Sequence, residues 1–157
     1  MKDFNYYDFL KLAKQLFHDE KYQSEAAIRT IIGRSYYSVF LHVREFIKDN
    51  LEKLDPNLYE EFMQYILPKG VVHSSVRKII KKLSFKLGYK IAKLSDLRKD
   101  ADYDLSIIIS KQEAEEAIQT AEELMLQVNE ELAKSFENKI SEVKLIIEEY
   151  KTKVKRI

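Results

Sequence analysis

Apolar residues recur every three or four positions along most of the chain, which is the spacing of one face of an α-helix. The pattern predicts a first helix over residues 3–19, with Asp3 as its N-cap, and a second helix over residues 24–51. Apolar positions cover more than half of the circumference of the second helix. Because a helix of that kind buries most of its surface, we expect residues 24–51 to lie centrally in a bundle.

Capping residues predict two further helix starts. Asp55 is followed by proline, and aspartate caps a helix N-terminus while proline fits the first helical turn, so a short helix should begin here and end before Gly70. Ser110 and Glu113 have the spacing of a capping box, in which each residue binds a free backbone N–H of the other. They should open the last long helix, which continues to Leu132.

The segment between these two starts predicts one more apolar stripe. It runs along a helix over residues 71–86, and a similar stripe continues toward Ala101. Gly88 stands between the two parts, and glycine is a common helix end. We therefore expect a break or a kink at Gly88.

Residues 133–157 carry a regular heptad pattern. Their apolar positions alternate spacings of four and three residues: Phe136, Ile140, Val143, Ile147, Tyr150, Val154 and Ile157. Such a seam packs against another helix. The pattern predicts a helical extension that packs either on its own chain or against a second copy, and it divides the chain into a bundle over residues 1–132 and an extension over residues 133–157.

The composition favours an all-α fold. The chain has 3 Gly and 2 Pro in 157 residues, whereas an all-β protein needs a turn about every 8 to 12 residues. We therefore predict an up-and-down bundle of four to five helices with a C-terminal heptad-patterned extension.

The same composition narrows the chemistry. The chain has no Cys and 3 His, which excludes disulfides and cysteine metal sites. The sequence contains no metalloprotease or phosphate-loop motif, so we expect no metal and no cofactor. No apolar run approaches the ~20 residues that span a bilayer, and the N-terminus has no signal-peptide pattern, so we expect a cytoplasmic protein that does not contact membranes.

Charge is unevenly distributed although the net charge is +1. Residues 69–100 hold ten Lys or Arg and two Asp, and residues 101–150 hold four Lys and 13 Asp or Glu. Helix 71–86 should present its cations on the solvent face, opposite the apolar stripe; this predicted basic patch comprises Arg77, Lys78, Lys81, Lys82 and Lys86. Such a face suits phosphate groups, and the alternative is an ordinary solvated surface.

Arg34 lies among apolar and aromatic residues of the predicted central helix. A buried guanidinium requires a carboxylate or several acceptors. Asp102 and Asp104 follow the stripe that ends near Ala101, so we predict that Arg34 pairs with one of them.

Three short motifs occur in a specific order. They are the run from Arg34 through Tyr36-Tyr37 to Phe40, then His73-Ser74-Ser75-Val76, then Arg98 followed by Ala101-Asp102-Tyr103-Asp104. Over residues 3–132 this arrangement resembles the HEPN family (higher eukaryotes and prokaryotes nucleotide-binding domains). The resemblance implies a helical bundle that dimerises and works beside a minimal nucleotidyltransferase in toxin–antitoxin pairs. The binding residues that it implies are Arg34, Tyr37, His73, Arg98, Asp102, Tyr103 and Asp104.

Many HEPN proteins are metal-independent ribonucleases in which a histidine follows an arginine after four to six intervening residues. After Arg98 the corresponding positions are Tyr103, Asp104 and Leu105, and no other arginine has a histidine at that distance. We therefore predict a non-catalytic protein that binds a nucleotide or RNA phosphates, as a homodimer and as the partner of a minimal nucleotidyltransferase.

Two alternatives stay open at this point. One is a ribonuclease toxin with a degenerate active site, in which Arg98, Tyr103 and Asp104, or His73, supply altered chemistry. The other is a helical scaffold whose acidic and basic faces bind another protein. Cleavage of RNA without metal would favour the first alternative. Binding to another protein, with no affinity for nucleic acid, would favour the second.

Overall fold

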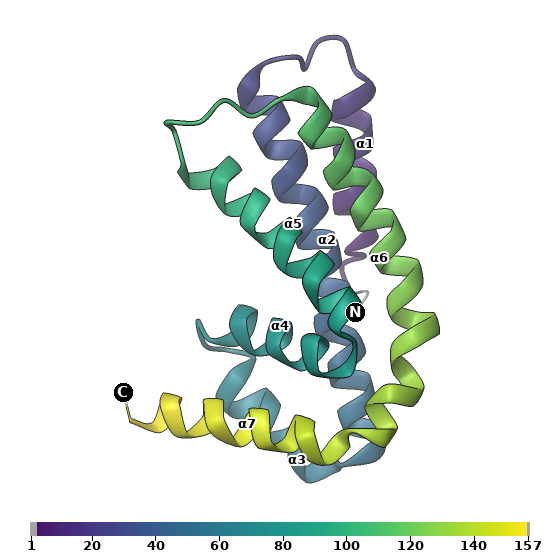
Figure 1. Ribbon diagram of the computed structural model, residues 1–157, viewed down its shortest axis with the longest axis vertical. Coiled ribbons are helices and arrows are strands. Elements are labelled where there is room, and N and C mark those ends of the chain that lie inside the picture. Colours follow the sequence, from purple (N-terminus) through teal and green to yellow (C-terminus); the bar gives the residue numbers. More distant parts are fainter. Residues whose placement is uncertain (1–2, 157) are drawn as a thin grey trace. The chain divides into compact units, whose positions relative to one another are not determined.

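All regular structure in the described residues, 3–156, is helical, as the computed structural model in Figure 1 shows. The all-α prediction is confirmed. The elements in chain order are α1 (Tyr7–His18), α2 (Glu25–Leu54), α3 (Pro56–Glu61), the π-helical turn η1 (Phe62–Ile66), α4 (Val72–Leu83), α5 (Phe85–Tyr103), α6 (Lys111–Asn138) and α7 (Ile140–Lys155).

The chain forms two compact units. The first unit comprises residues 1–42 and 90–126, and the second unit comprises residues 43–89 and 127–157. The boundary between the units falls inside α2, α5 and α6, so each of these helices contributes to both units.

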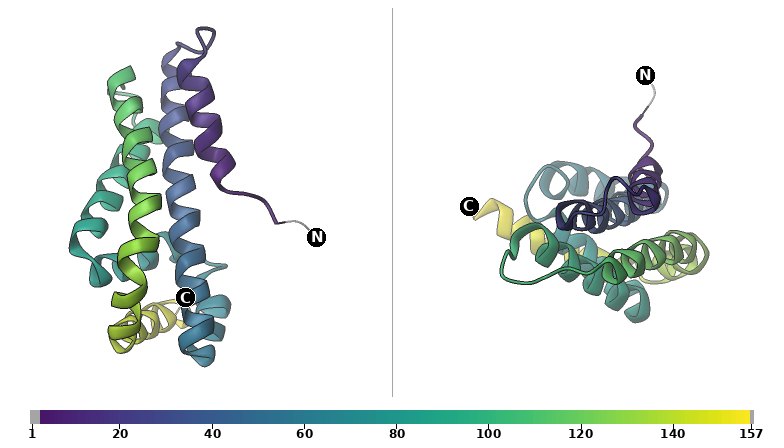
Figure 2. Two further views of the ribbon diagram at one scale, coloured as in Figure 1. Left: turned by 90° about the vertical axis from the view of Figure 1, so that its right-hand side faces the viewer. Right: turned by 90° about the horizontal axis from the view of Figure 1, so that it is seen from above.

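The first unit is an up-and-down bundle of four helical segments. It contains α1, the beginning of α2, the end of α5 and the beginning of α6. Short connections over residues 19–24 and 104–110 reverse the chain between successive helices, and Figures 1 and 2 show α1 and α2 side by side. Its buried apolar residues include Leu10, Ala13, Ile31, Ile32, Tyr36, Val39, Leu94, Ala101, Ala117, Ala121 and Leu124.

Two predicted helix caps are confirmed. The backbone N–H of Glu113 donates to Ser110 Oγ at 3.2 Å, and that of Ser110 donates to Glu113 Oε1 at 3.1 Å. Asp55 Oδ1 accepts from the backbone N–H of Leu58 at 3.1 Å, with proline in the first turn of α3. These local hydrogen bonds explain why the sequence alone located both helix starts.

The first helix begins later than predicted. It starts at Tyr7 rather than near Asp3. Asn5 Oδ1 accepts from the backbone N–H of Tyr7 at 3.1 Å, and Asn5 O accepts from that of Asp8 at 3.0 Å. An asparagine side chain that binds the backbone two residues ahead initiates a turn, so a turn at Asn5 leads into the helix, whose N-cap is Tyr6 rather than Asp3.

The predicted break at Gly88 is wrong, because the chain bends at Ser84. Ser84 is extended, with φ −152° and ψ 111°, and its Oγ accepts from the backbone N–H of Leu87 at 3.3 Å. Gly88 lies inside α5, where a Cβ atom would come within 2.5 Å of Lys81 Cα. The glycine is therefore required by the close approach of α5 to α4, not by a turn.

The heptad segment packs within its own chain. In the second unit, α7 contacts α3, η1 and α4, and its buried residues are Val143, Ile146, Ile147 and Tyr150. Helix α6 continues through Leu132 to Asn138, so the boundary predicted after residue 132 falls inside a helix. Ile157, the last position of the predicted seam, lies outside the described residues.

Candidate functional site

Two arginines contact one tyrosine ring in the first unit. The guanidinium carbons of Arg34 and Arg98 each lie 5.0 Å from the centre of the Tyr37 ring. Arg34 and Tyr37 are one turn apart on α2, and Arg98 reaches them from α5. The Arg34 guanidinium also lies 5.1 Å from the centre of the Phe9 ring on α1. Three helices of the bundle thus bring two cations and two aromatic rings together.

Arg98 is held more tightly than Arg34. Its Nη2 donates to the Tyr37 hydroxyl at 2.6 Å, and its Nε lies 3.0 Å from Asp102 Oδ2. The Nε atom is buried, and its direction toward the carboxylate is too poor for a hydrogen bond, so the attraction between these two groups is ionic. The guanidinium also lies 5.3 Å from the centre of the Tyr36 ring. These contacts offset the cost of burying a side chain that is only 12% exposed.

The surroundings of Arg98 also affect its ionisation. Burial acts to lower the pKa of Arg98, but the hydrogen bond to Tyr37 and the charges of Tyr37, Asp102 and Tyr103 outweigh it and raise the pKa above its ordinary value. Arg98 is therefore a permanent cation.

Tyr103 gives the site an open aromatic face. It is the last residue of α5, its ring centre lies 5.8 Å from the Arg98 guanidinium, and the residue is 73% exposed. We call Arg34, Tyr37, Arg98, Asp102 and Tyr103 the Arg98 cluster. Five of the seven binding residues implied by the HEPN resemblance thus lie together in this cluster.

The predicted partner of Arg34 is wrong. Asp102 pairs with Arg98, and Asp104 Oδ1 accepts from the backbone N–H and the hydroxyl of Ser106, at 3.0 and 2.5 Å. Over residues 3–156, Arg34 takes part in no ion pair. Because Arg34 is half-buried, solvent and the faces of two rings suffice for its guanidinium, and a carboxylate is not required.

Asp104 belongs to the connection between α5 and α6. The two hydrogen bonds from Ser106, followed by the nearby charge of Arg29, lower the pKa of Asp104 below its ordinary value. The Asp104 carboxylate is thus bound within the turn that follows α5. It is not part of the Arg98 cluster, although the resemblance implies a binding role for it.

Arg29, which the sequence reasoning did not select, fixes this connection. Its guanidinium donates to the backbone carbonyls of Asp100, Ala101, Asp104 and Ile107, at 3.1, 2.9, 3.0 and 2.6 Å. It also forms an ion pair with Glu25 at 3.0 Å. The last carbonyls of a helix have no partners within the helix and carry its negative dipole end, so a cation is favoured there. A possible signal was the Glu25–Arg29 spacing, which indicates a local pair but nothing about α5.

The remaining predicted residues lie in the second unit. His73 is half-buried in the first turn of α4. Lys78 Nζ donates to Glu149 at 2.7 Å, and Lys82 Nζ lies 3.9 Å from Glu142; both glutamates belong to α7. In the part of the chain that the structure describes, the other members of the basic patch form no ion pairs: Arg77, Lys81 and Lys86. Two glutamates of α7 therefore neutralise part of the basic patch.

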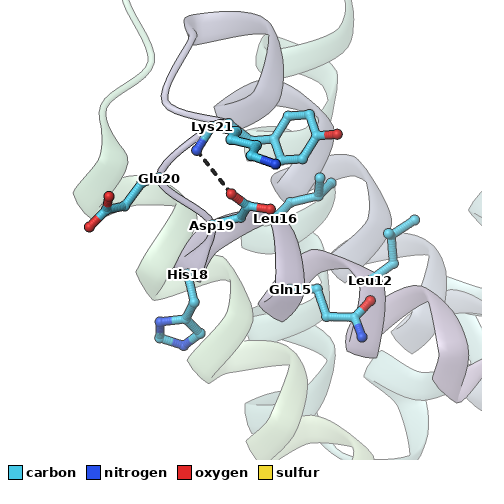
Figure 3. Close-up of a pocket in the computed structure, with 8 residues that line it drawn as sticks. Leu12, Gln15, Leu16, His18, Asp19, Glu20 and Lys21 are labelled. Carbon is cyan, nitrogen blue, oxygen red and sulfur yellow. Dashed lines mark hydrogen bonds between the residues drawn. The ribbon is translucent and has the colours of Figure 1, made fainter.

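A separate hollow of about 890 Å³ lies at the end of α1, and Figure 3 shows the side chains that line it. It is lined by residues between Leu12 and Tyr22, and the backbone N–H of Lys21 donates to Asp19 Oδ1 there at 2.9 Å. None of the predicted site residues lines it. In residues 3–156 no three His, Asp or Glu side chains are grouped to hold a metal ion, and no helix has the length and apolarity to cross a membrane.

Two uncharacterized proteins of Methanocaldococcus jannaschii are similar to this chain over nearly its whole length. MJ0992 is 31% identical over an alignment of 165 residues, and this alignment covers 96% of this chain and 90% of that protein. MJ0628 is 28% identical over 160 residues, covering 98% and 95% of the two chains. No family model matches the chain, and no solved structure matches it significantly. The resemblance to HEPN domains therefore stays a prediction.

Proposed function

The chain belongs to the same family as the uncharacterized protein MJ0992 of Methanocaldococcus jannaschii, and we propose that it binds the phosphate groups of a nucleotide, free or within RNA, at the Arg98 cluster without cleaving them. The observation that carries the proposal is the pair of guanidinium groups on the Tyr37 ring, with the carboxylate of Asp102 paired to Arg98. Two cations and one anion leave a net positive charge.

Each part of the cluster suits a part of a nucleotide. Guanidinium groups bind phosphate oxygens through paired, charge-assisted hydrogen bonds. Arg34 is the better placed of the two arginines to do this, because it has no ion pair in the described residues while Arg98 is held by Tyr37 and Asp102. The exposed ring of Tyr103 offers a flat surface for stacking a base.

The residue types around Arg98 favour binding over catalysis. The side chains that contact its guanidinium are tyrosines and an aspartate: Tyr36, Tyr37, Tyr103 and Asp102. General acid–base catalysis is most effective with a pKa near neutrality, and tyrosine and aspartate as residue types have reference values of about 10 and 3.9. The cluster contains no histidine to fill that role.

The proposal extends to partners through the HEPN resemblance. It gives the chain a second copy of itself and a minimal nucleotidyltransferase as partners, in a toxin–antitoxin pair within the cytoplasm. Light scattering on the purified chain measures its mass in solution, and co-purification with the product of an adjacent nucleotidyltransferase gene tests the second partner. A monomer that retains no such protein contradicts this extension and leaves the binding proposal in place.

The binding test uses Arg34, because its loss should disturb the fold less than the loss of Arg98. Fluorescence anisotropy with labelled ATP and with a labelled single-stranded RNA measures affinity for wild type and Arg34→Gln. Hydrogen bonds to charged groups contribute about 1.5–3 kcal/mol, so we expect affinity to fall about tenfold to a hundredfold. The slope of log affinity against log salt for the RNA should fall by about 0.7, the loss of one phosphate contact.

Lys93→Gln is the matched control, since it removes one positive charge from an exposed position on α5 outside the cluster. It should bind as the wild type does. Equal affinities for Arg34→Gln and Lys93→Gln overturn the proposal. RNA cleavage in EDTA that disappears in Arg98→Gln establishes the ribonuclease alternative instead, and a protein that binds neither probe favours the scaffold.

A further inference from the structure

The second unit carries two aromatic side chains on its surface. Phe85 is 70% exposed and Tyr89 is 62% exposed, and they lie one turn apart on the same face of α5. Single exposed apolar residues are common, but two large rings on one helix face form an exposed apolar patch, a feature common at interaction sites.

Two cations continue this patch along α4. Arg77 and Lys81 are one turn apart on α4, and Lys81 Nζ lies 5.6 Å from the centre of the Phe85 ring. The close approach at Gly88, where a Cβ atom would come within 2.5 Å of Lys81 Cα, fixes α5 against α4 at this point. The residues Arg77, Lys81, Phe85 and Tyr89 thus form one continuous row, which we call the α4–α5 row.

The charge of the row is positive and largely uncompensated. The sequence contains no Asp or Glu between residues 62 and 95. Lys78 and Lys82 face the glutamates of α7, but within residues 3–156 Arg77, Lys81 and the exposed Lys86 belong to no ion pair. Cations that form no ion pairs, beside open aromatic rings, are the combination that proteins use to hold phosphates and bases together.

We propose that the α4–α5 row binds single-stranded nucleic acid, with bases stacked on Phe85 and Tyr89 and phosphates bound by Arg77 and Lys81 of the row and by the adjacent Lys86. Side chains one turn apart on a helix have Cβ atoms about 5–6 Å apart, which is wider than the 3.4 Å step between bases stacked in a duplex strand. Bases that occupy both rings are therefore separated from one another, as only an unpaired strand allows.

This inference does not rest on the Arg98 cluster, because it uses other residues in the other unit. A single nucleotide such as ATP can occupy the cluster but has only one base and cannot span both rings of the row. ATP binding therefore reports on the proposed function, and the binding of an oligonucleotide to the two rings reports on the row.

The experiment compares labelled oligouridine, the DNA strand oligothymidine and a duplex RNA by anisotropy. In Phe85→Ala/Tyr89→Ala we expect affinity for both single strands to fall at least about fivefold per ring, because stacking of a base on an aromatic ring is worth a factor of that size or more. The salt slope should stay unchanged in this variant and fall in Lys81→Gln. Phe85→Trp should retain the affinity, since tryptophan also stacks.

Leu145→Ala is the control, because it removes an equally exposed apolar side chain from α7 in the same unit. It should bind as the wild type does. A loss with RNA only, with oligothymidine unaffected, limits the row to RNA and supports the inference. Three results overturn it: unchanged affinity in Phe85→Ala/Tyr89→Ala, equal loss in Leu145→Ala, or displacement of the strands by polyglutamate at equal charge, since polyglutamate supplies anions but no bases.

Discussion

Arg29 binds backbone oxygen atoms of the last turn of α5 and of the connection that follows it. Four of its hydrogen bonds go to carbonyls between Asp100 and Ile107, and the side chain is largely buried. Replacement by methionine keeps the length of the side chain and removes every one of these donors. The carbonyls of α5 then lose their charged partner, and the turn that ends in Tyr103 loses its support.

We expect Arg29→Met to lower the free energy of unfolding by about 3 kcal/mol, since charged hydrogen bonds are worth about 1.5–3 kcal/mol each in net terms and some of the carbonyls will regain water. Urea denaturation measures the change. Arg34→Met is the comparison, because Arg34 contacts rings rather than carbonyls and should cost only about 1 kcal/mol. Equal losses in the two variants contradict the role given to Arg29.

At the scale of elements, the junction of α4 and α5 depends on the absence of a single methyl group. In Gly88→Ala the new Cβ would lie 2.5 Å from Lys81 Cα, and this neighbour is backbone that cannot rotate away. We expect a loss of about 2–3 kcal/mol, at the upper end of the range for overpacking. Thermal unfolding measures it.

Gly70→Ala provides the control for Gly88→Ala. A Cβ at Gly70 has no atom within 4 Å, so the substitution should leave the unfolding temperature nearly unchanged. If both alanine variants unfold alike, the two helices can move apart without cost and the close approach is not what requires Gly88.

Helix starts were predictable from sequence where the cap is local. Ser110 with Glu113, and Asp55 with its proline, make their hydrogen bonds within a few residues, so the sequence contains all the information. The predicted helix break at Gly88 is wrong because glycine is favoured both at a helix end and where two helices approach closely. Local sequence does not distinguish them, since the decisive atom belongs to the facing helix.

The sequence motifs predicted which residues lie together in the candidate site, but they did not predict which arginine pairs with Asp102. The motifs named Arg34, Arg98 and Asp102, and the structure brings them together. Which arginine reaches the end of α5 depends on how α2 is rotated about its axis. Arg29 and Arg34 are five residues apart, about 140° around a helix, and this rotation is set by the packing of the whole bundle. The sequence pattern carries no direct measure of it.

At the scale of the whole molecule, several acidic groups titrate below their ordinary range. Hydrogen bonds from Lys78 and Lys153 lower the pKa of Glu149. At Glu45 burial acts to raise the pKa, but hydrogen bonds from Lys48 and Arg44 outweigh it and lower the value. The unfolded chain then binds protons more readily than the folded protein does. We therefore expect the free energy of unfolding to fall as the pH decreases from about 4.5 through the folded-state pKa values.

Lysines that bind carboxylates determine the alkaline limb of the plot of unfolding free energy against pH. The hydrogen bond to Glu149 raises the pKa of Lys78 above 10.5, and that to Glu61 raises the pKa of Lys151. Their stabilisation is complete below pH 10.5 and is lost as the pH rises through the folded-state values. Urea denaturation across pH measures both limbs. Glu149→Gln should flatten each of them, whereas Glu137→Gln, at an exposed position on α6, should leave them as they are.

The hydrogen bonds of Arg29 also determine how readily a protease cleaves the connection between α5 and α6. Tyr103 and Leu105 project into solvent, and chymotrypsin prefers such side chains. Cleavage, however, requires the backbone to enter the enzyme as a free extended strand, and Arg29 holds the carbonyls of Asp104 and Ile107 in place. Digestion at this connection therefore proceeds only through transient local opening. Its rate under conditions of rapid reclosing measures the equilibrium between the closed connection and the open one.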